Sequence, residues 1–154
     1  MPDGGVFFTW NYLLFDGVKR QLHCLRADET KMVITPSVEA WLDRLCKEGG
    51  SSLKERKLLA MAILNRRNKV PILTALEPFT LYFPWKYTDP DYSCWINRAR
   101  VCSVKDHFSR GIITFRDGQQ LEVPDARRLC SHLSDMDVLL QVLQPSSLFP
   151  DFLS

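Results

Sequence analysis

The residues of this chain that could act as acids, bases or metal ligands are few and widely spaced. Asp89 and Asp91 lie two positions apart, and paired carboxylates can bind a metal ion or exchange protons with a substrate. Pro90 between them indicates a turn, and no histidine is close in the sequence. The motifs G-x-S-x-G, H-E-x-x-H, G-x-x-x-x-G-K and G-x-G-x-x-G are absent. We therefore expect no enzyme activity, no metal and no cofactor.

A second candidate is the segment Gly49–Ser52, because free backbone amides at the start of a helix can hold an anion. This segment contains no lysine, and it lacks a nearby metal-binding acid. Ser52 and Glu55 instead have the spacing of a capping box, which satisfies amides at a helix start. Strong helix formers follow, so the sequence predicts a helix over 53–67 that ends before Pro71.

Positive charge is concentrated on this predicted helix. The segment Lys54–Lys69 has a net charge of +5, whereas the whole chain has +2. Its six basic residues are Lys54, Arg56, Lys57, Arg66, Arg67 and Lys69. Such a concentration suggests contact with a polyanion, although a solvated helix face is the alternative explanation.

The spacing of two arginines suggests a docking face on the same helix. Arg56 and Arg67 are eleven residues apart, which is about three helical turns, and Ala60 and Ile63 lie between them. That face could contact nucleic acid or a partner subunit. The continuous apolar run Leu58–Leu64 indicates that most of the helix is also part of the core.

The cysteines do not suggest a disulfide framework or a zinc site. There are five, with no C-x-x-C pair, and each is flanked by apolar residues. We expect all of them to be buried free thiols. Their positions are Cys24, Cys46, Cys94, Cys102 and Cys130.

Length and composition predict a single domain of 154 residues, with 45% hydrophobic and 25% charged residues. No window approaches the ~20 apolar residues that cross a bilayer. The first ten residues contain an acid and no basic residue, unlike a signal peptide. A cytoplasmic protein is expected.

The predicted elements give strands, two helices, more strands and a last helix. We expect N-terminal strands within 1–35, a helical part over 36–69, strands and a closing helix over 70–143, and a tail over 144–154. Thr35 or Ser37 should cap the first helix, which should run to Lys47. The fold class is therefore α+β, with antiparallel sheets, two central helices and a C-terminal helix.

Two details of the C-terminal half can be tested directly. Arg110-Gly111 is predicted to be a turn, and Asp117-Gly118 to be a hairpin turn. Trp95 and Phe115 are predicted to be buried on facing strands of one C-terminal sheet. A helix should follow Pro124-Asp125 and continue to about Leu143.

A set of short motifs is spread over about residues 35–143. They are Thr35-Pro36-Ser37, Gly50-Ser51-Ser52, Glu55-Arg56-Lys57, Lys69–Ile72, Leu81–Pro84, Cys94–Asn97 and Ile113–Gly118. No single motif is diagnostic, but together they have the order found in the ComK family of competence transcription factors, which the chain resembles over this range.

The resemblance implies a cytoplasmic, nucleoid-associated activator of genes for DNA uptake. It implies binding to paired A/T-rich boxes of double-stranded DNA, chiefly through the minor groove, as dimers that associate in pairs. It also implies an adaptor of a Clp-type protease as a further partner, and no membrane. Arginines suit a narrow, electronegative minor groove.

The chain departs from the family pattern in two places. Residues 129–154 carry three acids and no lysine or arginine, and Pro84-Trp85 stands where the family usually has Pro-Thr. The order of the Cys94–Asn97 block, the Asp-Gly hairpin and the last helix is also similar to the end of LytTR-type DNA-binding domains, at the level of topology.

Charge rather than a family contact map selects the candidate DNA-binding residues. These are Arg56, Lys57, Arg66, Arg67, Lys69, Arg98 and Arg100. The last two belong to a second group, with Arg110 and Arg116, that could join the surface formed by the others. The alternative function is a non-catalytic interaction module, or regulatory paralogue, that keeps the fold and has lost DNA binding. The near-neutral total charge favours this alternative, whereas the focused +5 favours DNA.

Overall fold

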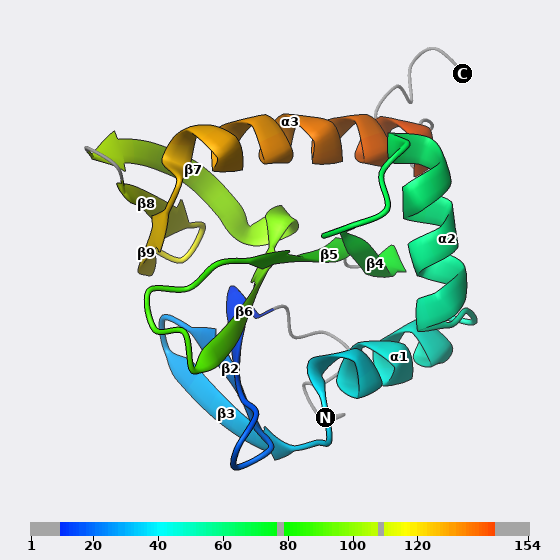
Figure 1. The fold of residues 1–154 in the computed structure, drawn as a ribbon, viewed down its shortest axis with the longest axis horizontal. Coiled ribbons are helices and arrows are strands. Elements are labelled where there is room, and N and C mark those ends of the chain that lie inside the picture. The colour runs from blue at the N-terminus through cyan, green and yellow to red at the C-terminus, as the bar shows by residue number, and fades with distance from the viewer. Residues whose placement is uncertain (1–9, 77–78, 108–109, 144–154) are drawn as a thin grey trace.

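The computed structural model describes residues 10–76, 79–107 and 110–143 (Figure 1). The fold is α+β, as predicted, with two antiparallel sheets and three α-helices in the described part of the chain. The larger sheet has six strands in the order β3-β2-β1-β6-β5-β4. Their bounds are β1 Tyr12–Asp16, β2 Gln21–Arg26, β3 Glu29–Ile34, β4 Ile72–Leu76, β5 Phe79–Trp85 and β6 Tyr92–Asn97.

The smaller sheet has the order β7-β8-β9, and a 3-10 turn, Arg98–Arg100, leads into it from the larger sheet. Its strands are β7 Val101–His107, β8 Arg110–Phe115 and β9 Gln120–Pro124. The β8–β9 hairpin turns at Gly118, whose φ of 92° favours glycine, as the Asp-Gly signal predicts.

Two helices follow β3 and cover one face of the larger sheet. Helix α1, Val38–Glu48, starts at Ser37, whose side chain accepts a hydrogen bond from the amide of Ala40. Helix α2, Leu53–Leu64, starts at Ser52, whose hydroxyl accepts from the amide of Glu55, as the capping-box spacing predicts. Both helices contact β4.

Helix α3, Ala126–Leu143, lies on the opposite face of the larger sheet (Figure 1). Successive residues of β5 show this, because side chains alternate between the two faces of a strand. Tyr82 packs edge-on against Trp41 of α1, whereas Phe83 contacts the ring of His132 of α3. The core therefore lies on both faces of the larger sheet.

The C-terminal sheet differs from the expectation in two ways. Arg110 and Gly111 are not a turn but the first residues of β8, paired with His107 and Asp106. A Cβ atom on Gly111 would lie 2.8 Å from the Cβ of Ala126, so this glycine allows β8 to approach the start of α3. Trp95 and Phe115 are both buried, but they belong to different sheets.

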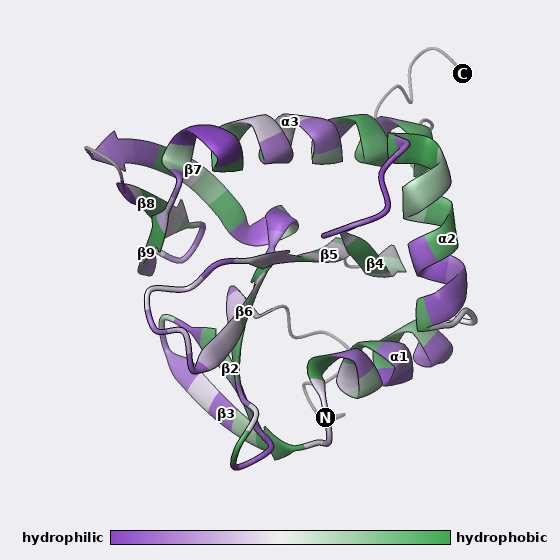
Figure 2. Cartoon of the chain, viewed as in Figure 1, coloured by the Kyte–Doolittle hydropathy of each residue, from purple (hydrophilic) through white to green (hydrophobic). Residues whose placement is uncertain are grey.

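Helix α2 is shorter and less buried than predicted. Asn65 ends it in the left-handed conformation, with φ 53°, so Arg67 lies beyond the helix and not on a face with Arg56. Ala60 is 2% exposed and cannot form a docking face, whereas Leu58 and Leu59 are exposed. Figure 2 shows hydrophobic residues on the later turns of α2 and on the adjoining end of α3, whereas the first turns of α2 are hydrophilic.

The prediction that all five cysteines are buried is wrong for two of them. Cys24, Cys46 and Cys94 are buried, and burial raises the pKa of each thiol. Cys102 of β7 and Cys130 of α3 are exposed. All five are free thiols.

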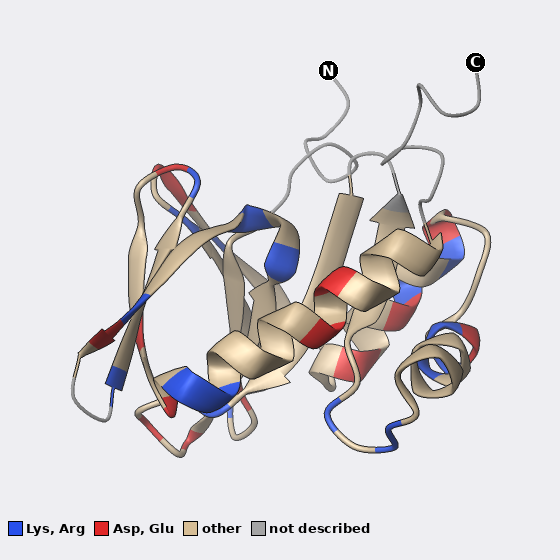
Figure 3. Ribbon diagram, turned by 90° about the horizontal axis from the view of Figure 1, so that it is seen from above, with Lys and Arg blue, Asp and Glu red and all other residues tan. Residues whose placement is uncertain are grey.

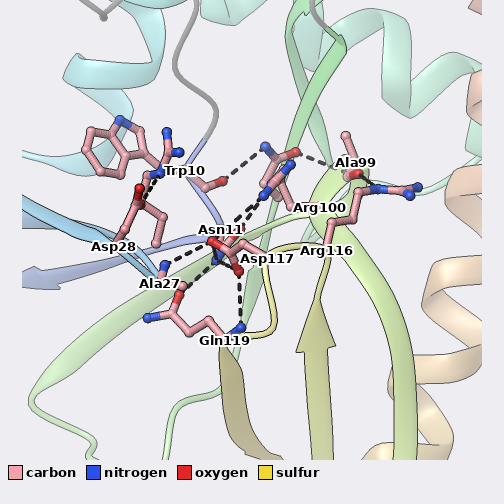
Figure 4. A network of polar contacts seen from close by, with 11 residues as sticks. Trp10, Asn11, Ala27, Asp28, Ala99, Arg100, Arg116, Asp117 and Gln119 are labelled. Carbon is pink, nitrogen blue, oxygen red and sulfur yellow. Dashed lines mark hydrogen bonds and ion pairs between the residues drawn. The ribbon is translucent and has the colours of Figure 1, made fainter.

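A polar network joins the two sheets where β1 begins (Figure 4). The carboxylate of Asp117 in the β8–β9 turn accepts hydrogen bonds from Asn11 Nδ2 and from the amide of Ala27, both at 2.9 Å. Arg100 donates from Nε to Asn11 Oδ1 at 3.1 Å and lies 3.8 Å from Asp117. Burial acts to raise the pKa of Asp117, but these hydrogen bonds outweigh it and hold the pKa below its ordinary value.

We predict that Asp117→Ala lowers the free energy of unfolding by about 2–3 kcal/mol, because Asn11, Ala27 and Arg100 lose their shared acceptor. Asp117→Asn keeps an acceptor oxygen without the charge and should cost less. Equilibrium denaturation in urea measures both. A loss below about 1 kcal/mol for the alanine variant would show that the network contributes little.

Candidate nucleic-acid interface

The loop that follows α2 contacts α3 through the side chain of Arg66. Because Asn65 ends the helix, Arg66 can turn toward α3. Its Nη1 lies 2.6 Å from Nδ1 of His132, and its Nη2 lies 2.5 Å from a carboxylate oxygen of Asp135. Arg66 is thus held by two side chains one turn apart on α3, which fixes the loop against this helix.

His132 is a buried, neutral histidine, with 7% of its surface exposed. Its ring lies 5.4 Å from that of Phe83 and 5.5 Å from that of Trp85, measured between ring centroids. Burial and the charge of Arg66 lower the pKa of His132 from 6.5 to about 4. Since a guanidinium can only donate, Nδ1 is the acceptor and the ring proton is on Nε2.

A pocket of about 470 Å³ opens between this loop, the end of β5 and the first half of α3. Four cationic side chains line it: Arg66, Lys69, Lys86 and Arg128. We call it the basic pocket. Figure 3 shows Lys and Arg at the first turn of α3 and in the loop after α2, whereas Asp occupies the middle of α3.

Trp85 forms part of the wall of the basic pocket. Its Nε1 donates a hydrogen bond to the carbonyl of Pro124 at 3.1 Å, which ties the end of β5 to the last residue of β9, two positions before α3. Two acids, Asp125 and Asp135, also line the pocket, and Asp135 is paired with Arg66. The pocket therefore keeps an excess of positive charge from Lys69, Lys86 and Arg128.

The structure divides the predicted cluster over 54–69 into two parts. Arg66 and Lys69 line the basic pocket, and Arg67 is exposed beside them in the sequence. Arg56 and Lys57 are half-buried on α2. The Nε atom of Arg56 is buried and has no hydrogen-bond partner among the described residues.

The second predicted group is largely engaged within the molecule. Arg98 pairs with Asp137 of α3 at 3.0 Å, and Arg100 belongs to the network around Asp117. Arg110 pairs with Glu122 at 2.5 Å. The Nε atom of Arg116 donates to the carbonyl of Ala99 at 2.7 Å. The structure does not bring this group together with the cations of the basic pocket.

Two lining residues, Lys86 and Arg128, were not among the predicted site residues. The dipeptide Arg127-Arg128 at the start of the last predicted helix was the available signal. Lys86 is isolated in the sequence, and only the approach of β5 to α3 places it at the pocket.

Within the described ranges, no group of three or more His, Cys, Asp or Glu side chains could hold a metal ion. No helix in these ranges is long and apolar enough to span a bilayer.

The buried His132 predicts a pH-dependent stability. The unfolded chain binds a proton at this residue more readily than the native state, since the native pKa is the lower one. Stability should therefore fall as the pH decreases from 6.5 to about 4, by up to about 3 kcal/mol. Urea denaturation across this range measures the dependence. His132→Gln should flatten the curve over this range, and an unchanged slope would contradict the assignment.

The comparisons with known proteins agree with the motif order in the sequence. Residues 19–132, well over half of the chain, match the family described as ComK protein. No curated protein and no solved structure matches the chain. The family resemblance predicted from the motifs is confirmed, and the chain belongs to the ComK family of competence transcription factors.

Proposed function

We propose that the protein is a sequence-specific DNA-binding activator of competence genes, with no catalytic activity. The family match over residues 19–132 is the observation that carries the proposal. The geometry supports it by collecting exposed cations from distant segments at one pocket.

The exposed cations are the ones available for a polyanion. Lys69, Lys86 and Arg128 are exposed at the basic pocket, whereas Arg98 and Arg100 are mostly buried and paired with acids. Lysine and arginine side chains at the surface bind phosphates by displacing condensed counterions. The focused charge thus supports DNA binding although the total charge is only +2. The DNA contacts predicted from the sequence at Arg56, Lys57 and Arg67 stay predictions.

The remaining parts of the proposal rest on the family. The target is double-stranded DNA with A/T-rich boxes, contacted through the minor groove. The protein binds it as a homodimer or a larger homo-oligomer. It is located in the cytoplasm with the nucleoid, and an adaptor of a Clp-type protease controls its amount.

One observation favours the alternative of a protein-interaction module. Large apolar side chains are exposed on two contacting helices, Leu58 and Leu59 on α2 and Val138 and Val142 on α3. Exposed apolar residues on adjacent elements can form a protein-binding surface.

The first DNA-binding prediction tests whether DNA contacts the cations of the basic pocket or is attracted by the overall charge of the protein. The double variant Lys69→Ala/Arg128→Ala should weaken binding to an A/T-rich duplex. The slope of log K against log salt should become shallower by about 1 to 2, because up to two phosphate contacts are lost. Fluorescence anisotropy over a salt series measures both quantities.

The matched control is Lys19→Ala/Lys31→Ala, which removes the same charge from exposed positions at the β1–β2 turn and on β3. Its slope should stay close to that of the wild type. Equal slopes for the two double variants would move the contact surface away from the basic pocket. Undetectable binding of the folded wild-type protein at low salt would favour the interaction module.

The second DNA-binding prediction concerns the groove. Distamycin, which occupies the minor groove of A/T tracts, should displace the protein. Duplexes with 7-deaza-purines, altered only in the major groove, should bind normally. The opposite pattern in the same anisotropy assay would exclude minor-groove reading and favour a LytTR-like mode.

A further inference from the structure

The ring of His132 lines the basic pocket, but one of its nitrogens is buried beneath the pocket surface. The Nε2 atom of His132 is buried and has no partner among the residues that the structure describes. Because Nδ1 accepts from Arg66, Nε2 carries the ring proton and can only donate. This nitrogen has almost no accessible surface, so a ligand in the pocket does not reach it, and the cationic side chains that line the pocket are the donors available to a ligand.

The charged side chains that line the basic pocket favour binding of an anion. Lys69, Lys86 and Arg128 come from three separate segments, so they can approach one ligand from different sides. The carboxylate of Asp135 is already paired with Arg66 and leaves these cations unneutralised. Among the residues that the structure describes, Asp125 is the one other acid that lines the pocket.

The backbone at the pocket adds support. Lys69 and Asp125 both line it, and they adopt φ values of 54° and 59°. Such left-handed conformations are unfavourable for residues other than glycine and often occur at functional sites. A lysine thus occupies a position where glycine would be less strained.

We propose that the basic pocket is a binding site for a phosphate group, with the side chains of Lys69, Lys86 and Arg128 as donors and the ring of His132 in its wall. A phosphate offers several acceptor oxygens and up to two negative charges, which matches several cationic donors at one pocket. The volume of about 470 Å³ lies within the range of small-molecule sites, so the group that carries the phosphate also fits. The inference holds whether or not the protein binds DNA.

The chain has three histidines, so the imidazole nitrogens can be followed individually by NMR of ¹⁵N-histidine-labelled protein. At pH 7, His132 should show the neutral form with the proton on Nε2. Titration with inorganic phosphate should shift the His132 nitrogens in a saturable way. His23 on β2 and His107 on β7 are internal controls and should not follow the same curve.

Two matched variants test the location of the site. Ser131→Phe places a large side chain at the pocket without changing the charge and should abolish the saturable shift. Ser134→Phe, also at an exposed position of α3 but outside the pocket lining, should leave the shift intact. Equal behaviour of the two variants would overturn the proposal.

A third variant separates binding from a structural role. Lys69→Gly relieves the left-handed backbone, so its denaturation midpoint should be equal to or above that of the wild type. Its affinity for phosphate should nevertheless fall about tenfold, because a charged donor is lost. Unchanged affinity in this folded variant would contradict the role of Lys69.

The source of the phosphate is resolved by comparing three probes: inorganic phosphate, a 5′-nucleotide and an A/T-rich duplex. If an A/T-rich duplex produces the same His132 shift and competes with inorganic phosphate, the pocket takes a backbone phosphate of DNA. If phosphate and a 5′-nucleotide shift His132 but the duplex does not, the ligand is a free phosphate compound. Failure of phosphate and duplex alike to shift His132 overturns the inference. The proposed DNA binding stands or fails separately, on the anisotropy measurement.

Discussion

The arrangement around the basic pocket depends on the position of one guanidinium group, that of Arg66. It joins the loop after α2 to α3 by donating to Nδ1 of His132 and pairing with Asp135. A cation at this site disfavours a second charge on the imidazole, which therefore stays neutral with its proton on Nε2. The same ion pair neutralises the carboxylate of Asp135. This one interaction thus fixes the loop against α3 and keeps His132 neutral, while the positive charge of the pocket comes from Lys69, Lys86 and Arg128.

The other arginines near the core follow the same physical rule. Arg98 and Arg100 have 21% and 24% of their side chains exposed, and each pairs with an acid from a distant segment. A mostly buried cation without a partner is costly, so these residues use their charge to hold the fold. Lys69 and Lys86 are exposed and need no such partner. A chain with a small total charge can therefore have a positive local surface, because several of its acids pair with partly buried arginines while these lysines stay exposed.

The sequence predicts the elements better than their ends or partners. Local chemistry is sufficient to predict the start of α2, because Ser52 and Glu55 have the spacing of a capping box. It is insufficient at Asn65, because Arg66 and Arg67 are good helix formers and the helix ends where the loop turns to α3. Alternation likewise predicts that Trp95 and Phe115 are buried, but not that they belong to different sheets, since periodicity carries no information on strand pairing.

The candidate site could be predicted only where its residues are neighbours in the sequence, and α3 shows why. Its first turns supply Arg128, its middle carboxylates hold Arg66 and Arg98, and its last turns expose apolar side chains. A charge count along the sequence treats these acids as opposing the basic residues. In the folded protein Asp135 and Asp137 pair with Arg66 and Arg98, so they offset the exposed cations Lys69, Lys86 and Arg128 less than a count along the sequence indicates. The position of α3 on the sheet, which tertiary packing decides, therefore determines where a polyanion can bind.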